Sequence, residues 1–142
     1  MEDELQPVDD GEFVYRRIHR QHFQPGIPSC VLVTAFRPTD DDKSGLSVFR
    51  QRFVQPVDTL LSVKEEKRKD HYVARLAVAD LRKLGLSVVP DPDPLGPHGH
   101  SLIPELTTQA YHADKRRWKD LQEELAKLAS ADIVHRPDSL VS

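Results

Sequence analysis

Residues 12–18 read Glu-Phe-Val-Tyr-Arg-Arg-Ile, and this stretch predicts the first strand of a sheet. Aromatic and β-branched residues prevail in it, and both types favour extended backbone. Residues 30–36 form the most apolar run of the chain and predict a buried strand, because turn residues bound the run. The stretches 46–54 and 71–77 predict two more strands, so a sheet is expected to be the basis of the fold.

Two helices are predicted between and after these strands. The first begins at Pro56, since proline is favoured in the first turn of a helix, and ends in the mixed charge run at 64–70. The second covers 78–84 and ends before Gly85, a residue suited to the position after a helix.

Short strands and one long loop are predicted next. Residues 86–89 and 100–106 read as strands, and Pro104 places the second at a sheet edge or a bulge. Between them, four prolines at 90–97 exclude regular structure and predict a stiff loop.

The helical signal is strongest at 114–129, where apolar residues recur every three or four positions. Such a stripe packs against the chain's own sheet or against a partner helix, and the sequence leaves both alternatives open. Because the helix lies near the end of the chain and its stripe is narrow, it is the candidate partner-binding surface. The stripe comprises Trp118, Leu121, Leu125 and Leu128.

This order of elements predicts an α+β fold with a mixed or largely antiparallel sheet, two short helices and a C-terminal amphipathic helix. The expected organisation is a disordered acidic tail at 1–11, a single domain at 12–130 and a frayed tail at 131–142. The acidic tail has two interpretations: it keeps the chain soluble, or it covers a basic site or binds a partner.

Composition narrows the class of protein. The chain has 142 residues, of which 38% are hydrophobic, enough for one core. It has no apolar run of ~18 residues, so no membrane span is expected. A single cysteine excludes an intramolecular disulfide and a cysteine-based zinc site. The absence of a signal-like N-terminus favours a cytoplasmic location.

Charge is unevenly distributed along the chain. The first ten residues contain five acidic residues and no Lys or Arg, whereas the rest carries 20 basic and 18 acidic residues. A nearly neutral body is unlike proteins that coat nucleic acid, although a local basic patch remains compatible with nucleic-acid or nucleotide binding.

A cluster of cationic and imidazole side chains lies at the end of the first predicted strand: Arg16, Arg17, His19, Arg20 and His22. Arginine offers a planar fork of donors to phosphate or carboxylate, and histidine moves protons near neutral pH. The cluster therefore predicts a site for a phosphate-bearing ligand. The alternative is that the arginines cover an open sheet face and the histidines lie at a turn.

A second histidine pair, His98 and His100, follows the proline-rich loop. Joined to the first cluster, it suggests a metal-independent acid–base site, since a histidine pair with arginines can cleave a phosphodiester. No metal-binding spacing accompanies it, so neither a metal nor another cofactor is predicted. The candidate catalytic residues are Arg17, His19, His22 and His100. The candidate ligand-binding residues are Arg16, Arg20 and His98.

Three residues on or just after neighbouring predicted strands are candidates to line the same cleft as the first strand: Thr34, Arg37 and Ser47. Cys30 has no activating base beside it in the sequence, which favours a buried, inert thiol.

Five short motifs lie between residues 13 and 106. They are Arg-Arg-Ile-His-x-x-His at 16–22, Ala-Phe at 35–36, Leu-Ser-Val at 46–48, Leu-Gly-x-x-Val-Val-x-Asp-Pro at 84–92 and His-x-Leu-Ile at 100–103. Together they resemble a family of short, uncharacterised bacterial proteins that has no settled activity. The resemblance implies a bacterial, cytoplasmic protein and directs attention to the motif histidines.

Three hypotheses for function follow. The first is a protein-binding accessory module of a bacterial regulatory or defence operon, acting through the leucine stripe. The second is a small enzyme or ligand-binding protein that acts on a phosphate-containing substrate, RNA or a nucleotide, through the Arg/His cluster. The third is a sequence-tolerant nucleic-acid binder whose arginines contact phosphates.

Overall fold

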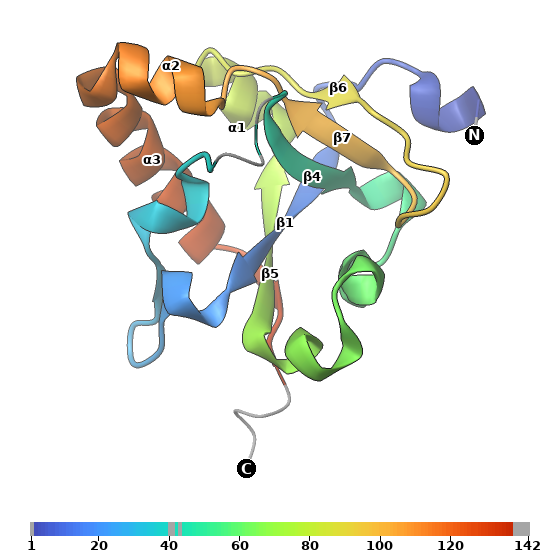
Figure 1. Ribbon diagram of the computed structural model, residues 1–142, viewed down its shortest axis with the longest axis horizontal. Coiled ribbons are helices and arrows are strands. Elements are labelled where there is room, and N and C mark those ends of the chain that lie inside the picture. The colour runs from blue at the N-terminus through green and yellow to red at the C-terminus, as the bar shows by residue number, and fades with distance from the viewer. Residues whose placement is uncertain (1, 40–41, 43, 138–142) are drawn as a thin grey trace.

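The strand predicted at 12–18 is β1 (Phe13–His19), and it lies inside a six-stranded antiparallel sheet (Figure 1). The structure is a computed structural model that describes residues 2–39, 42 and 44–137. The sheet order is β6-β7-β4-β1-β5-β8, and every neighbouring pair in it is antiparallel. The predicted α+β fold is confirmed. Of the two sheet types that the sequence left open, mixed or largely antiparallel, the structure has the antiparallel one.

The other strands of this sheet are β4 (Leu46–Arg50), β5 (His71–Ala77), β6 (Val89–Pro90), β7 (His100–Ile103) and β8 (Ile133–His135). The strand at 71–77 has the predicted bounds. β7 ends at Ile103, before Pro104, and the expected edge position or bulge is not found in the described part of the chain, because β4 and β6 pair with β7 on its two sides. A separate two-stranded sheet pairs β2 (Phe23–Gln24) with β3 (Cys30–Val31).

Apolar residues cover both faces of the main sheet. The larger core lies between one face and the helices α1 (Val78–Lys83) and α3 (Lys115–Ser130). The smaller core lies on the other face, beneath the 3₁₀ helix η5 (Pro56–Ser62). Consecutive residues of β4 serve the two cores, because Val48 is buried in the larger and Phe49 in the smaller. The broken alternation of 46–54 therefore reflects burial on both faces.

Residues at the helix ends explain where three of the helices start or stop. The oxygen of Asp114 accepts from Arg117 N at the start of α3, and the hydroxyl of Thr107 accepts from Ala110 N at the start of α2 (Thr108–Ala113). α1 ends as predicted, with Gly85 at φ +82° just after it. Sequence reasoning missed α2 because its six residues show no apolar periodicity.

The strand predicted at 30–36 is wrong beyond Val31. The chain instead forms the 3₁₀ helix η3 (Val33–Phe36), which buries Ala35 and Phe36. A short apolar run does not by itself distinguish strand from buried helix.

Other predicted boundaries also shift. The strand at 46–54 stops at Arg50 and continues as η4 (Gln51–Phe53). The helix beginning at Pro56 is η5, and the following charge run forms η6 (Glu65–Asp70). The strand expected at 86–89 is only the two-residue β6, which follows a loop.

The disordered tail predicted at 1–11 is wrong for the described residues. η1 (Glu2–Leu5) and the segment after it pack on the domain, Val8 enters the larger core, and Asp10 forms an ion pair with Arg82. The frayed tail predicted at 131–142 is also wrong up to residue 137, because β8 pairs with β5. Residues 138–142 lie outside the described part of the chain.

None of the helices in the described ranges combines the length and apolar character needed to cross a membrane.

Candidate functional site

A cleft opens where two central strands separate. β1 pairs with β5 along its whole length, from Phe13↔Ala77 to His19↔His71. It pairs with β4 only at Val14 and Tyr15, after which β4 turns away (Figure 1). A cavity of about 820 Å³ lies beside the second half of β1.

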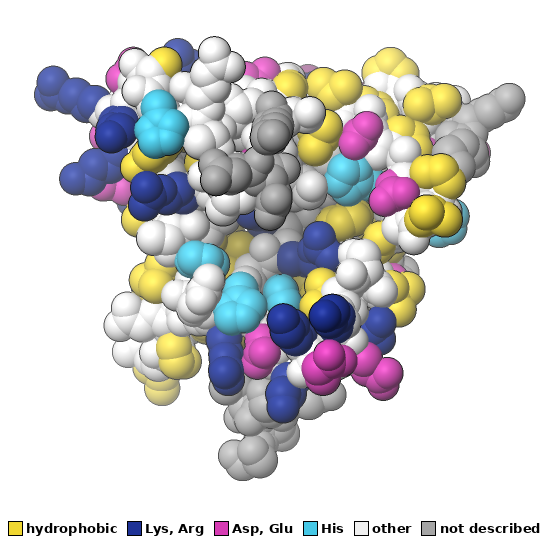
Figure 2. All heavy atoms as spheres, in the orientation of Figure 1, with side chains coloured by type: hydrophobic (Ala, Val, Ile, Leu, Met, Phe, Trp, Pro, Cys, Tyr) yellow, Lys and Arg dark blue, Asp and Glu magenta, His cyan; other side chains and the backbone are white. Residues whose placement is uncertain are grey.

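Positive charge and imidazole groups prevail in this cleft, which we call the cationic cleft. Among the described residues that line it are three arginines, four histidines and one carboxylate. Figure 2 shows Lys/Arg and His side chains gathered around the middle of this face. The charged and titratable lining residues are Arg16, Arg17, Arg37, His19, His22, His71, His112 and Asp42.

Arg16 bridges the separated strands. Its Nη1 donates to the Ser47 carbonyl of β4 at 3.0 Å, and its Nη2 donates to the Ala35 carbonyl of η3 at 3.2 Å. The Nε is buried and has no hydrogen-bond partner among the described residues. Burial lowers the pKa of Arg16 to about 10, with Asp42 opposing the shift, so the side chain stays charged at neutral pH.

Arg17 is fixed on the opposite wall by η5. Its Nη1 donates to the Thr59 carbonyl at 3.2 Å and to Ser62 Oγ at 2.6 Å. Its guanidinium carbon lies 5.1 Å from the centre of the Phe49 ring. Burial lowers the pKa of Arg17 from its ordinary value. Both arginines are therefore held in place by backbone carbonyls before any ligand arrives.

His19 and His71 face one another across the β1–β5 pair. Their ring centres are 5.2 Å apart in an edge-to-face arrangement. His19 Nδ1 accepts from Gln21 N at 3.1 Å, so the neutral ring carries its proton on Nε2. His71 Nδ1 lies 3.0 Å from the Lys67 carbonyl, so it carries the proton there and leaves Nε2 as an acceptor. The two rings thus offer one donor and one acceptor nitrogen.

The positions of His71 and His22 hold both rings neutral near pH 7. The pKa of His71 is lowered by burial and by the charges of His19 and Arg17, against an opposing hydrogen bond to Lys67 O. The pKa of His22 is lowered by burial, then by His19 and Arg16.

His22 is positioned from the next element along the chain. It lies in η2 (Arg20–His22), the 3₁₀ turn that follows β1, and its Nδ1 is 2.8 Å from Thr34 Oγ1. The interpretation that the histidines lie at a turn is thus correct for this segment, because the His19 side chain caps η2. The turn directs His22 into the cleft rather than away from it.

The rim of the cleft includes residues that sequence reasoning missed. α2 contributes Thr108, Tyr111 and His112. The Arg37 guanidinium lies 5.1 Å from the centre of the Tyr111 ring. No residue spacing connects α2 with β1, so the sequence carried no signal for these contacts. Thr34 and Arg37, which were candidates for this cleft, do line it.

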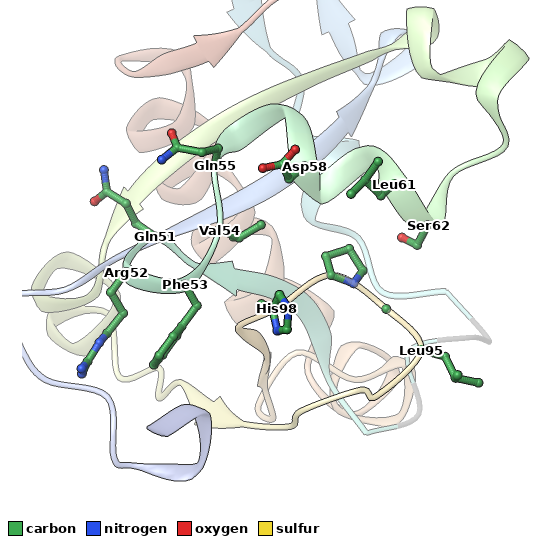
Figure 3. A pocket seen from close by; sticks show the side chains of 12 residues that line it. Gln51, Arg52, Phe53, Val54, Gln55, Asp58, Leu61, Ser62, Leu95 and His98 are labelled. Atoms are coloured by element: carbon green, nitrogen blue, oxygen red, sulfur yellow. The ribbon is translucent and has the colours of Figure 1, made fainter. Parts of the chain in front are cut away.

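Three predicted site residues lie outside the cationic cleft. Arg20 is 68% exposed and pairs with Asp70. His98 lines a second cavity of about 540 Å³, between the 95–98 loop and η5 (Figure 3), where its Nδ1 is 3.4 Å from Glu4 Oε2. His100 contacts Ser47 from β7. His98 and His100 therefore do not line the cationic cleft with His19 and His22, because β7 pairs with β4 whereas β1 beyond Tyr15 pairs with β5.

The predicted partner stripe is largely occupied by the chain's own core. Trp118 is 4% exposed and Leu125 is fully buried, whereas Leu121 and Leu128 are half-buried. The fully buried face of α3 also includes Gln122 and Ala129. The face of α3 that packs on the core is thus rotated about the helix axis away from the leucine stripe, because small and polar residues also pack into the core.

Comparison with protein-family models, curated proteins and solved structures finds no match to this chain. Within the described residues, no group of three His, Cys, Asp or Glu side chains is arranged to hold a metal ion. The chemistry available in the cleft is that of fixed guanidinium groups, hydroxyl groups and imidazoles of opposite tautomer. Such a set binds oxyanions and can transfer protons.

Proposed function

We propose that this protein binds a phosphate-bearing ligand of about nucleotide size in the cationic cleft. The observation that carries the proposal is the excess of cationic groups over carboxylates along the described wall of one cavity. A cavity of about 820 Å³ is larger than a free phosphate needs and falls within the range of organic-ligand sites.

The identities of the donors favour phosphate. Guanidinium groups match the oxygens of phosphate in paired hydrogen bonds, and hydroxyl groups complete such a shell. Arg16 has a buried Nε without a partner among the described residues. The hydroxyls of Thr34, Thr39 and Thr108 also lie along the wall, where they contact His22, the Asp42 carboxylate and the Thr39 carbonyl, so the guanidinium groups carry the argument for phosphate.

The alternative function, a protein-binding accessory module, has less surface to support it. It required an apolar stripe on α3, and two of the four stripe residues are buried in the core. Leu121 and Leu128 are half-buried, so Leu121→Asp tests this alternative. The resemblance to bacterial proteins supports a bacterial, cytoplasmic protein as part of the same proposal.

The test is isothermal titration at low ionic strength with sulfate, pyrophosphate, adenosine monophosphate and acetate as separate ligands. Arg37 and His22 line the cleft, and Arg37 is exposed, so Arg37→Gln and His22→Gln leave the core intact. Arg20→Gln is the matched control, because Arg20 is exposed and does not line the cleft.

We expect the nucleotide and pyrophosphate to bind and acetate to bind far less. A charge-assisted hydrogen bond contributes about 1.5–3 kcal/mol, so each cleft variant should weaken binding by at least about tenfold. Arg20→Gln should change the affinity by less than twofold. Equal loss in Arg20→Gln and Arg37→Gln, or no binding of any phosphate compound, would overturn the proposal. A stoichiometric protein captured by the wild type and lost with Leu121→Asp would favour the partner-binding alternative.

A further inference from the structure

Outside the cationic cleft, a serine, a histidine and an aspartate form a connected chain on β4, β7 and the loop between β6 and β7. Ser47 Oγ lies 3.0 Å from His100 Nε2. On the other side of the ring, His100 Nδ1 lies 2.8 Å from the Asp91 carbonyl and 3.2 Å from Asp91 Oδ2. We call these three residues the serine triad.

The contacts of the ring determine its tautomer. A carbonyl oxygen only accepts, so His100 Nδ1 must carry a proton and donate it to Asp91. The neutral ring then has a lone pair on Nε2, and the Ser47 hydroxyl donates to that nitrogen. A serine whose proton points at a histidine nitrogen, while the other ring nitrogen donates to a fixed acceptor, is an arrangement that activates a nucleophile; here the acceptor is the Asp91 carbonyl, with the Asp91 carboxylate 3.2 Å from the same nitrogen.

The triad lies where a reagent can reach it. Ser47 is half-buried, and the side chains of His100 and Asp91 are 17% and 55% exposed. The His100 ring centre is 5.5 Å from that of Phe49, and the Arg17 guanidinium carbon is 5.1 Å from the same ring. The Phe49 ring thus lies between the His100 ring and the Arg17 guanidinium.

We propose that Ser47 is a nucleophile activated by His100 and that its substrates are carboxylic esters. Ser47 Oγ attacks the ester carbonyl carbon and its proton passes to His100 Nε2. The bond from that carbon to the alcohol oxygen breaks, and the alcohol leaves with the proton from His100. Water then adds to the acyl-serine through the same base, which releases the carboxylic acid and restores Ser47. One ester and one water give one acid and one alcohol, with no oxidant or reductant.

The test is covalent labelling of the full chain by a fluorophosphonate, followed by intact-mass and peptide-mapping mass spectrometry. Attack by the serine expels fluoride, so the chain should gain the mass of the probe less hydrogen fluoride, and the label should map to Ser47. Ser47→Ala should abolish labelling. His100→Gln should slow it by about 100-fold, the contribution of a general base. Ser29→Ala, in the β2–β3 loop, is the matched control and should label like the wild type.

A second readout is the release of nitrophenol from p-nitrophenyl acetate, which should show a burst equal to the enzyme concentration. Circular dichroism and sulfate titration of Ser47→Ala and His100→Gln show whether each variant is folded with an intact cleft. The proposal does not depend on the function of the cleft, because those titrations report it separately. Absence of labelling, a label on another residue, or equal rates in His100→Gln and the wild type would overturn it.

Discussion

Arg50 is the residue whose replacement tests the fold most directly. It is fully buried, and its guanidinium donates to both carboxylate oxygens of Glu12, at 2.9 and 2.8 Å. The remaining donors reach backbone carbonyls of the N-terminal segment, at Glu4, Gln6 and Pro7. One side chain thus connects β4 to a segment that composition alone suggests is disordered.

Replacing Arg50 by methionine keeps much of the volume and removes every one of these hydrogen bonds. The Glu12 carboxylate, only 11% exposed, then loses its partner, and three carbonyls lose their donor. Removing one member of a buried ion pair costs about 3–5 kcal/mol, because the other charge stays buried and unpaired. For a chain of this length, that loss lowers the melting temperature on the order of 10 °C.

The assay is urea unfolding followed by the fluorescence of Trp118, the only tryptophan of the sequence, which is 4% exposed in the core. Arg52→Met is the matched control, since Arg52 is exposed, and a substitution there should change stability by less than ~0.5 kcal/mol. If Arg50→Met and Arg52→Met unfold at the same urea concentration, the N-terminal segment does not pack through Arg50 and the reasoning fails.

The ion pair between Arg50 and Glu12 should also make the stability of the protein depend on pH in acid. Hydrogen bonds from Arg50 and Asp9 hold the pKa of Glu12 below its usual value, although burial opposes them. A carboxyl group with a lowered pKa in the folded state adds stability above its unfolded pKa and loses it as the pH falls through the folded pKa. The wild type should therefore lose more stability than Arg50→Met when the pH is lowered below about 4.5, which urea midpoints measured across that range will show.

Three further predictions concern turns, core and cleft. Gly45 has φ +124°, and an added Cβ would lie 2.4 Å from a carbonyl oxygen of β7. Gly45→Ala should therefore lower the free energy of unfolding by at least about 2 kcal/mol. Gly11→Ala is the control, since Gly11 has open space around it, and it should change the urea midpoint little. Leu125→Ala should cost about 2–5 kcal/mol because Leu125 is fully buried, and half-buried Leu121→Ala should cost clearly less in the same assay; equal losses would contradict the placement of α3. Sulfate should bind more tightly as the pH falls below about 6.5. Burial and neighbouring cations keep the pKa of His22 low, so the ring gains its proton, and the cleft gains a positive charge, only below that pH. Calorimetry that shows a flat or opposite trend would contradict this.

Local patterns were sufficient to predict only those regular elements that carry a clear period of apolar residues. The alternation at 71–77 and the stripe at 114–129 each carry their own period, so β5 and α3 were found close to their bounds. The apolar run at 30–36 has no period, and its second half forms a helical turn instead of a strand. The N-terminal segment was misjudged because its order depends on contacts with Arg50, 38 or more positions away in the chain.

The candidate site was predictable only where it is local in sequence. Arg16, Arg17, His19 and His22 come from one continuous stretch, and the structure places them in one cleft. His100 resembles them in type but lies on β7, and β7 diverges from that end of β1 together with β4. Strand order decides this separation, and no spacing in the sequence specifies it.

The arginines explain how so irregular a chain can place a cleft inside its sheet. Backbone carbonyls in 3₁₀ turns and separated strands lack the regular partners of a helix or sheet, and burying them without donors is costly. Arg16 satisfies the carbonyls of β4 and η3, and Arg17 and Arg68 satisfy those of η5. The same bonds that stabilise the irregular segments fix two of these guanidinium groups in the cleft. A ligand therefore meets positive charge that is already ordered, and its binding does not have to restrict those side chains.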